Sequence, residues 1–395
     1  MKCIGVILII TAFIFMHANC DNKTIFLAQL TSEGARSYIG SNPTDKVWEF
    51  GPGEITSMGL RQQYLVGYDL KVNYAVALDL ERKTGTRQEP LPIYSPWQVN
   101  IRSTNHNYTL MGAQAGLEAL YPPDARDDLT SDQAKIAEPP GDNTSIVDDI
   151  KKLENKIMPN NFQTLPIHAM DFDKDTVLMK DWCQDIETKN KEEVNEQAFI
   201  DKISNKYSEA LNKFKDLMVQ DNLTIHEIYD YMDGLYTAQF NLDNIGEFGA
   251  IYDDLMKFRF DYYTQYWNND QSRKVFANGF VQDLKRYLAD AKEQYENEVL
   301  DNYKEMKMSL YYGTLESAYV ISRQFGYNHT EGPLFSSQLL FELFIDDENT
   351  YQVKVMFNKQ DITLGGDCGD KTVCELSSFN SLLQSMTASE SQMAD

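Results

Sequence analysis

The chain has 395 residues, of which 42% are hydrophobic, and its 60 acidic and 36 basic side chains give a formal net charge of −24. This length can bury a large core, so we expect one domain with a large insertion or two closely packed lobes. The excess of carboxylates argues against a nucleic-acid partner, because phosphate binding needs clustered cations. It disfavours an anionic membrane surface for the same reason.

Residues 1–20 have the layout of a secretory signal peptide. Lys2 precedes an apolar stretch, and small residues follow at Ala18 and Cys20. The apolar stretch of about 14 residues is short for a membrane span, which leaves a signal anchor as the weaker alternative. No later segment is apolar enough to cross a bilayer, so we predict no membrane span after signal removal and a secreted or lysosomal/endosomal location.

N-glycosylation sequons support a secretory route. Five follow the signal segment, at Asn22, Asn107, Asn143, Asn222 and Asn328.

Signal removal leaves three cysteines, at Cys183, Cys368 and Cys374. The last two flank the turn-rich segment GDKTV, so we predict a disulfide between them in an oxidising compartment. A zinc site is the alternative, but no nearby His or further Cys would complete it. We therefore predict neither a metal nor a cofactor.

The first predicted elements alternate between strand and helix. Residues 24–30 form a β-branched and aliphatic run typical of a buried strand, and residues 53–71 have helical spacing behind the capping residue Thr56. A second strand follows within 97–104, and then a helix over 109–121 that Pro122 and Pro123 stop. Residues 124–147 are polar and rich in turn formers, which predicts a loop.

The pattern changes to helices over residues 148–300 and then returns to strands. MSLYYG (308–313) predicts a strand and LESAYVISRQFG a helix, and two alternating segments within 336–346 and 351–358 predict an antiparallel pair. We therefore predict an α/β fold, a three-layer core with a mixed central sheet flanked by helices. The core would comprise 21–147 and 270–395, and a helical cap would be inserted over 148–269.

Four segments resemble the histidine acid phosphatase family, in its secreted and lysosomal branch. They are ITSMGLRQQYLVG, IRSTNHNYTLMGAQAGLEALYPP, LPIHAM and PLFSSQLLFELF, and the second is the most specific. The resemblance spans nearly all of the chain after the signal. It implies hydrolysis of phosphomonoesters through a covalent phosphohistidine, with arginines that neutralise the phosphate and an acid that protonates the leaving oxygen.

The catalytic turn of the family, R-H-G-x-R, falls on Ser32, Glu33, Gly34, Ala35 and Arg36. The first arginine is therefore a serine and the nucleophilic histidine a glutamate, while the glycine and the second arginine are kept. We expect Arg36 and Ser32 to be what remains of the phosphate-binding site of the family, an anion-site remnant.

Two further motif positions lie later in the chain. The R-S-T strand keeps its arginine as Arg102, which we include in the anion-site remnant. The His-Asp pair falls on Thr314 and Leu315, so both of its members are missing.

None of the five histidines restores the lost pattern, because none follows an Arg or precedes an Asp. His17 leaves with the signal, and His226 is expected to pack within the helical insertion. We expect His106 and His329, inside or beside sequons, to be exposed. His168 matches the segment that leads into the cap and is our candidate for a cleft residue, with plain packing as the alternative.

These substitutions predict a pseudoenzyme that acts as a binding or structural protein. We expect Glu33 to pair with Arg36 and Arg102 as a built-in anion; alternatively, the two arginines pair with other carboxylates. The competing prediction is an acid phosphomonoesterase with rearranged residues, in which Glu33 is the nucleophile and Glu316 the acid.

The resemblance also bears on partners and on Cys183. The expected partner is an unknown protein or a small anionic ligand, and relatives suggest a homodimer through the edge of the core sheet. Cys183 matches a cap-region cysteine whose partner, near the C-terminus in relatives, has no counterpart in this chain. A buried free thiol is therefore expected, with an intermolecular bridge as the alternative.

Overall fold

The computed structural model describes residues 22–44, 48, 51–82, 89–141, 144–297 and 305–389. The predicted signal peptide and the sequon at Asn143 lie outside these residues. Within the described part of the chain, no helix is long and apolar enough to cross a membrane.

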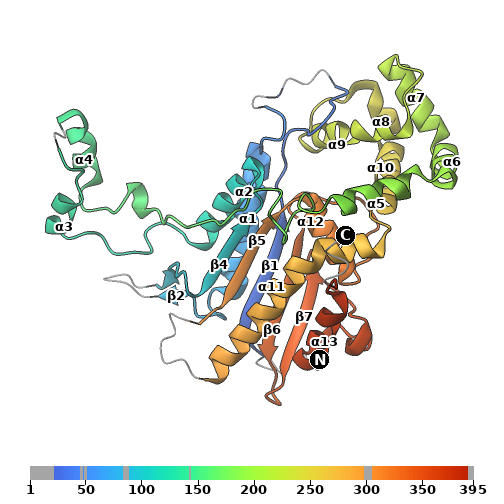
Figure 1. The fold of residues 1–395 in the computed structure, drawn as a ribbon. Helices are drawn as coiled ribbons and strands as arrows, with labels where there is room; N and C mark the ends of the chain where they lie inside the picture. The colour runs from blue at the N-terminus through green and yellow to red at the C-terminus, as the bar shows by residue number, and fades with distance from the viewer. Residues whose placement is uncertain are drawn as a thin grey trace, which may run out of the picture.

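A mixed β-sheet forms the centre of the molecule (Figure 1). Its central strand β1 (Lys23–Ser32) pairs in parallel with β5 (Met308–Gly313) and antiparallel with β6 (Gln338–Ile345). Beyond these, β4 (Val99–Ser103) pairs with β5, and β7 (Tyr351–Phe357) pairs with β6, β8 (Gln360–Asp361) and β9 (Val373–Glu375). A separate two-stranded sheet joins β2 (Glu81–Arg82) to β3 (Leu91–Pro92).

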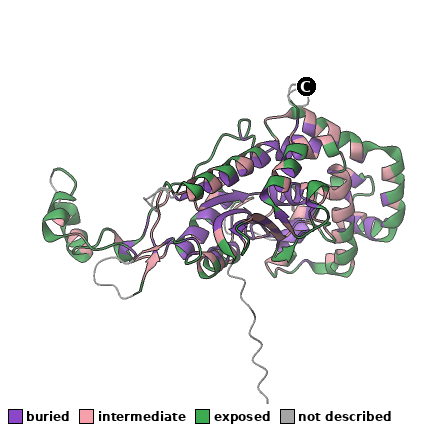
Figure 2. Cartoon of the chain, turned by 90° about the horizontal axis from the view of Figure 1, so that it is seen from below, coloured by how far each residue is buried: buried purple, intermediate pink, exposed green. Residues whose placement is uncertain are grey.

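Helices cover both faces of the sheet, as a run of buried residues along β1 requires. Leu27 packs in a cluster with side chains of α1 (Ser57–Tyr74) and α2 (Asn107–Leu120). The neighbouring Phe26 points the other way, into the cluster formed with α11 (Asp270–Glu296), α12 (Leu315–Gln324) and α13 (Leu376–Met386). Figure 2 shows the buried strands between these helices. The predicted three-layer α/β core is confirmed.

A group of helices with its own hydrophobic cluster lies beside the end of the sheet (Figure 1). Phe214, Leu235 and Phe258 are among the fully buried members of this cluster. The helices are α5 (Gln184–Asn195), α6 (Gln197–Lys206), α7 (Ser208–Met218), α8 (Ile225–Asp230), α9 (Met232–Phe240) and α10 (Tyr252–Tyr266), with a 3₁₀ segment at Gly246–Ile251.

The segment between α2 and this helical group extends away from the body of the molecule (Figures 1 and 2). It contains α3 (Ser131–Ile136), α4 (Val147–Leu153) and two 3₁₀ turns (Thr144–Ile146 and Pro159–Asn161), and neither α-helix has a buried residue. The prediction of a loop over 124–147 missed α3. Thr130 and Gln133 form a capping box that starts this helix within an otherwise polar stretch.

Cys368 and Cys374 are joined by a disulfide, as predicted. The bond links a 3₁₀ turn (Gly366–Cys368) to β9. Among the described residues, no group of three or more His, Cys, Asp or Glu side chains is arranged to hold a metal ion. Cys183 is a half-buried free thiol that packs against the main core at the start of α5.

Candidate functional site

The turn that follows β1 is fixed by its neighbours before any ligand is considered. The Ala35 amide donates to Gln62 Oε1 at 2.8 Å, which ties the turn to α1. A Cβ atom on Gly34 would lie 2.4 Å from the carbonyl oxygen of Gly59, so the backbones approach too closely for a larger residue. The glycine of the motif is thus required by packing alone.

Glu33 and Arg36 lie side by side within this turn, and both are buried. Arg36 Nε donates to Glu33 Oε1 at 3.1 Å. This part of the predicted built-in anion is present in the structure. The second oxygen, Glu33 Oε2, is buried without a hydrogen-bond partner among the described residues.

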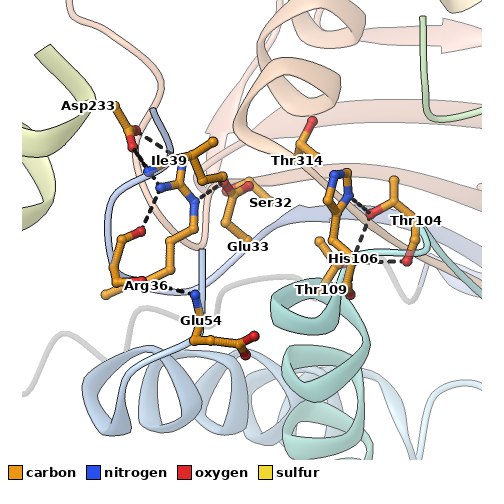
Figure 3. Close-up of polar contacts among 12 residues, drawn as sticks. Ser32, Glu33, Arg36, Ile39, Glu54, Thr104, His106, Thr109, Asp233 and Thr314 are labelled. Carbon is orange, nitrogen blue, oxygen red and sulfur yellow. Dashed lines mark hydrogen bonds and ion pairs between the residues drawn. The ribbon is translucent and has the colours of Figure 1, made fainter. Parts of the chain in front are cut away.

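A second carboxylate reaches Arg36 from the helical group. Asp233, in the first turn of α9, accepts from Arg36 Nη1 at 2.9 Å and from Nη2 at 3.1 Å, a bidentate pair. Figure 3 shows the Arg36 guanidinium between Glu33 and Asp233. The Ile39 amide also donates to Asp233, at 2.6 Å.

The sequence prediction did not include Asp233. The signal that could have found it is Gly234, an isolated glycine inside a helical pattern. A Cβ at Gly234 would lie 2.7 Å from the Ser41 carbonyl oxygen, so this glycine lets α9 approach the segment that follows Arg36.

Glu33, Arg36 and Asp233 form a charged cluster that we call the Arg36 triad, and its electrostatics follow from its burial. Burial raises the pKa of Glu33 more than Arg36 lowers it. Burial would raise the pKa of Asp233 too, but the bidentate arginine holds this pKa below its usual range. Burial opposes the charge of Arg36, yet Asp233 and Glu33 together raise its pKa above the ordinary value. Arg36 is therefore a cation whose charge is already neutralised by the Asp233 carboxylate, with Glu33 as a second hydrogen-bond acceptor.

A cavity of about 500 Å³ opens beside this triad. It is the candidate site because it contains the motif positions. A larger apolar groove of about 910 Å³ along α1 and α2 shares no residue with it. The cavity is lined by Glu33, Arg36, Ile39, Gly40, Ser41, His106, Tyr108, Met179, Tyr229, Asp230, Asp233, Arg259, Tyr263, Thr314, Leu315, Glu316 and Pro333.

The junction of β5 and α12 holds structural contacts where the family has its His-Asp pair. The Thr314 side chain caps α12 by accepting from the Ser317 amide at 3.2 Å. Leu315 is buried in a small cluster with Ala35 and Phe335. Thr314 and Leu315 therefore contribute a helix cap and apolar packing at the positions of the His-Asp pair.

Glu316, the alternative proton donor, is already engaged. Lys180 Nζ lies 3.1 Å from Glu316 Oε1, and it also reaches Glu187 Oε2 at 3.2 Å. The Glu316 carboxylate is thus held by an ion pair with the segment that precedes α5.

Arg102 differs from the expectation that it pairs with Glu33. Its Nη2 donates to Asp175 Oδ1 at 2.6 Å, and it does not line the cavity. The expectation that Glu33 pairs with both arginines was therefore wrong for Arg102. The third member of the buried cluster is Asp233. The alternative that the arginines pair with other carboxylates describes Arg102.

The structure places His168 and Ser32 outside the cavity. His168 is exposed, and its backbone pairs with the end of β4. Ser32 is buried, and its hydroxyl donates to the Leu334 carbonyl at 3.0 Å and accepts from the Ser337 amide at 2.9 Å. Through these two hydrogen bonds, Ser32 connects the end of β1 to the segment before β6.

The expectation that His106 and His329 are exposed was wrong. His106 is half-buried, lines the cavity, and stacks on Tyr108 with ring centroids 4.7 Å apart; burial lowers its pKa. His329 bonds Ser322 Oγ at 2.8 Å, and burial lowers its pKa to about 4. His226 packs within the helical group, where Nδ1 lies 2.7 Å from the Tyr262 hydroxyl. The predictions failed because a sequon requires exposure of its asparagine only. Asn107 and Asn328 are exposed, while the histidine next to each of them is half-buried.

Comparisons with known proteins agree on one family. The model described as histidine phosphatase superfamily (branch 2) matches residues 12–358. The lysosomal acid phosphatase of Xenopus laevis is 24% identical over 383 residues, covering 92% of this chain and 77% of the relative. The testicular acid phosphatase of Mus musculus is 30% identical over 126 residues, covering 30% of this chain and 27% of the relative.

Solved structures agree with this fold. The phytase of Citrobacter braakii superposes with a TM-score of 0.62 at 13% identity, covering 93% of this chain and 98% of its own. The Klebsiella sp. ASR1 phytase gives 0.59 at 11% identity, with 93% and 97% covered.

Proposed function

This chain belongs to branch 2 of the histidine phosphatase superfamily, and from that starting point we propose that it is a non-catalytic member whose cavity binds a ligand without hydrolysing it. The observation that carries the proposal is the Arg36 triad. Glu33 stands where the resemblance places the nucleophilic histidine, and together with Asp233 it occupies the guanidinium that would hold a phosphate.

Charge repulsion supports this proposal. A carboxylate about 4 Å from one phosphate charge costs roughly 1 kcal/mol in water and roughly 4 kcal/mol at an effective dielectric near 20. A phosphate dianion beside Arg36 would meet Glu33 and Asp233 together, both within hydrogen-bonding distance of the same guanidinium. The family substrate is therefore disfavoured where the family binds it.

The alternative is a phosphomonoesterase with rearranged residues. Its best support is Glu33, a cavity-lining residue whose buried Oε2 has no hydrogen-bond partner among the described residues. A carboxylate nucleophile would still lack a proton donor for the leaving oxygen, because Thr314 caps a helix and Glu316 is paired with Lys180. We therefore rank this alternative second.

We place the protein in the secretory or lysosomal lumen. The lysosomal and prostatic acid phosphatases among its relatives support this location. Four of the sequon asparagines, at Asn22, Asn107, Asn222 and Asn328, are exposed, as glycosylation would require.

The test is hydrolysis of 4-nitrophenyl phosphate by the purified protein from about pH 4 to about pH 8, since an aryl leaving group needs little acid assistance. We expect no turnover above a buffer blank. A Glu33→Gln variant is the matched control for activity. Turnover by the wild type would overturn the proposal, and its loss in this variant would assign Glu33 a chemical role.

A Glu33→His, Thr314→His, Leu315→Asp triple variant asks a separate question. Activity gained by this variant would show that the pocket geometry still suits the family reaction, and that the substituted side chains alone account for the loss.

A further inference from the structure

We propose that the cavity beside Arg36 binds a small organic cation, a primary amine carried on an aromatic or apolar body. This inference rests on the proposed non-catalytic function and names the ligand class of the same site. It differs from the anionic ligand that the family resemblance leads one to expect.

The charges around the cavity favour a cation. Among its lining residues, four carboxylates face two guanidiniums. Arg36 is occupied by Glu33 and Asp233, and Glu316 is paired with Lys180. Asp230 and Arg259 line the cavity without an ion pair within the described residues, and their formal charges offset one another. The formal excess of one negative charge therefore lies on the two carboxylates that share Arg36.

An independent observation points to a missing hydrogen-bond donor. Glu33 is only 3% exposed, it lines the cavity, and its Oε2 has no hydrogen-bond partner in the described part of the chain. A buried carboxylate oxygen that accepts no hydrogen bond from the protein is destabilising, because nothing in the protein compensates for its desolvation. An ammonium group in the cavity would supply both the donor and the opposite charge.

Aromatic rings provide the rest of a cation site. Tyr108, Tyr229 and Tyr263 line the cavity together with the His106 ring. Tyr229 stacks on Tyr262 with centroids 4.0 Å apart, so its orientation is fixed by packing. Ring faces attract ammonium groups and also cover apolar ligand surface. A volume of about 500 Å³ suits a small ligand of this kind.

Arg259 is the residue that could instead bind an anionic ligand in the same cavity. It lines the cavity without an ion pair within the described residues, and its guanidinium lies 4.6 Å from the centroid of the Tyr236 ring. An anionic ligand would have to bind there, with Asp230 and Asp233 lining the same cavity. The comparison of a cation with an anion is therefore the decisive measurement.

Calorimetric titration with three probes of similar shape provides that measurement. The probes are 2-phenylethylamine, 2-phenylethanol and 3-phenylpropionate, which carry a similar ring on a positive, neutral and negative chain. At neutral pH and low salt, we expect the amine to bind at least about tenfold more tightly than the alcohol, and the carboxylate to show no binding. Equal affinity for amine and alcohol, or no binding of the amine, would overturn the inference.

Variants locate the site. Glu33→Gln keeps the shape of the side chain, and we expect it to weaken amine binding by about tenfold or more. Glu247→Gln is the matched control, because Glu247 is an exposed carboxylate outside the cavity, and it should leave the affinity unchanged. Should Glu33→Gln fail to fold, Asp230→Asn, at a less buried position, replaces it. An unchanged affinity in the cavity variant contradicts the proposed site.

The outcomes separate the inference from the function on which it rests. Preferential binding of 3-phenylpropionate or inorganic phosphate, abolished by Arg259→Met, would replace the cation site with an anion site. Such a result, without hydrolysis of 4-nitrophenyl phosphate, would leave the non-catalytic function standing. Hydrolysis would remove the function itself, whatever the probes show.

Discussion

Arg36 and Arg102 are the two arginines that the family pattern keeps, and their surroundings differ. Arg36 is buried between Glu33 and Asp233 and lines the cavity. Arg102 lies at the end of β4, outside the cavity, with a side chain 17% exposed and paired with Asp175. Each arginine meets a carboxylate from a segment distant in the chain. A kept arginine is therefore no measure of anion binding until its partners are known.

The larger effect is expected at Arg36. In an Arg36→Met variant, Glu33 and Asp233 would lose their common partner, and removal of one partner from a buried ion pair typically costs about 3–5 kcal/mol of unfolding free energy. Urea denaturation followed by circular dichroism measures this loss. A change below about 1 kcal/mol would mean that water already screens the triad.

The matched change at the other arginine should cost less. We expect Arg102→Met to lower the unfolding free energy by about 2 kcal/mol, because Asp175 keeps other donors. Asp175 Oδ1 also accepts from the amides of Val177 and Leu178, at 3.1 and 3.2 Å. If Arg102→Met proves as costly as Arg36→Met, the contrast between the two regions fails.

The pH dependence of stability sharpens the contrast within the triad. The pKa of Glu33 is raised in the folded state, so this group stabilises the fold below its ordinary value of 4.5 and loses that contribution as the pH rises through the raised value. The pKa of Asp233 is lowered, so its contribution is present above 3.8 and is lost as the pH falls.

Thermal denaturation of Glu33→Gln and Asp233→Asn against pH measures these two slopes. We expect Glu33→Gln to flatten the decline above pH 4.5 and Asp233→Asn to flatten the loss at acidic pH. Identical profiles for the wild type and both variants would show that neither carboxylate changes its ionisation on folding.

The smallest effect is expected at an exposed ion pair in the chain segment next to Asp175, the partner of Arg102. Lys174 and Asp171 lie 2.7 Å apart, with side chains 62% and 66% exposed. We expect Lys174→Met to leave the urea midpoint unchanged, since solvent screens such pairs. This variant controls for the Arg102→Met result, and a shift of similar size in both would assign the effect to the segment rather than to the buried pair.

Elements with a strong local signal were predictable from sequence. The buried run of β1, the cap at Thr56 and the stop at Pro122 are decided by neighbouring residues, and the structure contains all three. The helix α3 was missed because its signal is a single capping box in a polar stretch. The orientation of His106 was missed because a sequon predicts exposure for the asparagine alone.

The sequence by itself determined which chemical groups are missing. Glu33, Thr314 and Leu315 lack the imidazoles and the acid of the family pattern, and a residue type needs no structure to be read. Only the tertiary structure decided which distant carboxylates hold the remaining arginines. Arg36 meets Asp233 across 197 positions of the chain, and Arg102 meets Asp175 across 73. Coulomb attraction depends on the distance through space, and that distance is set when α9 packs against the turn after β1.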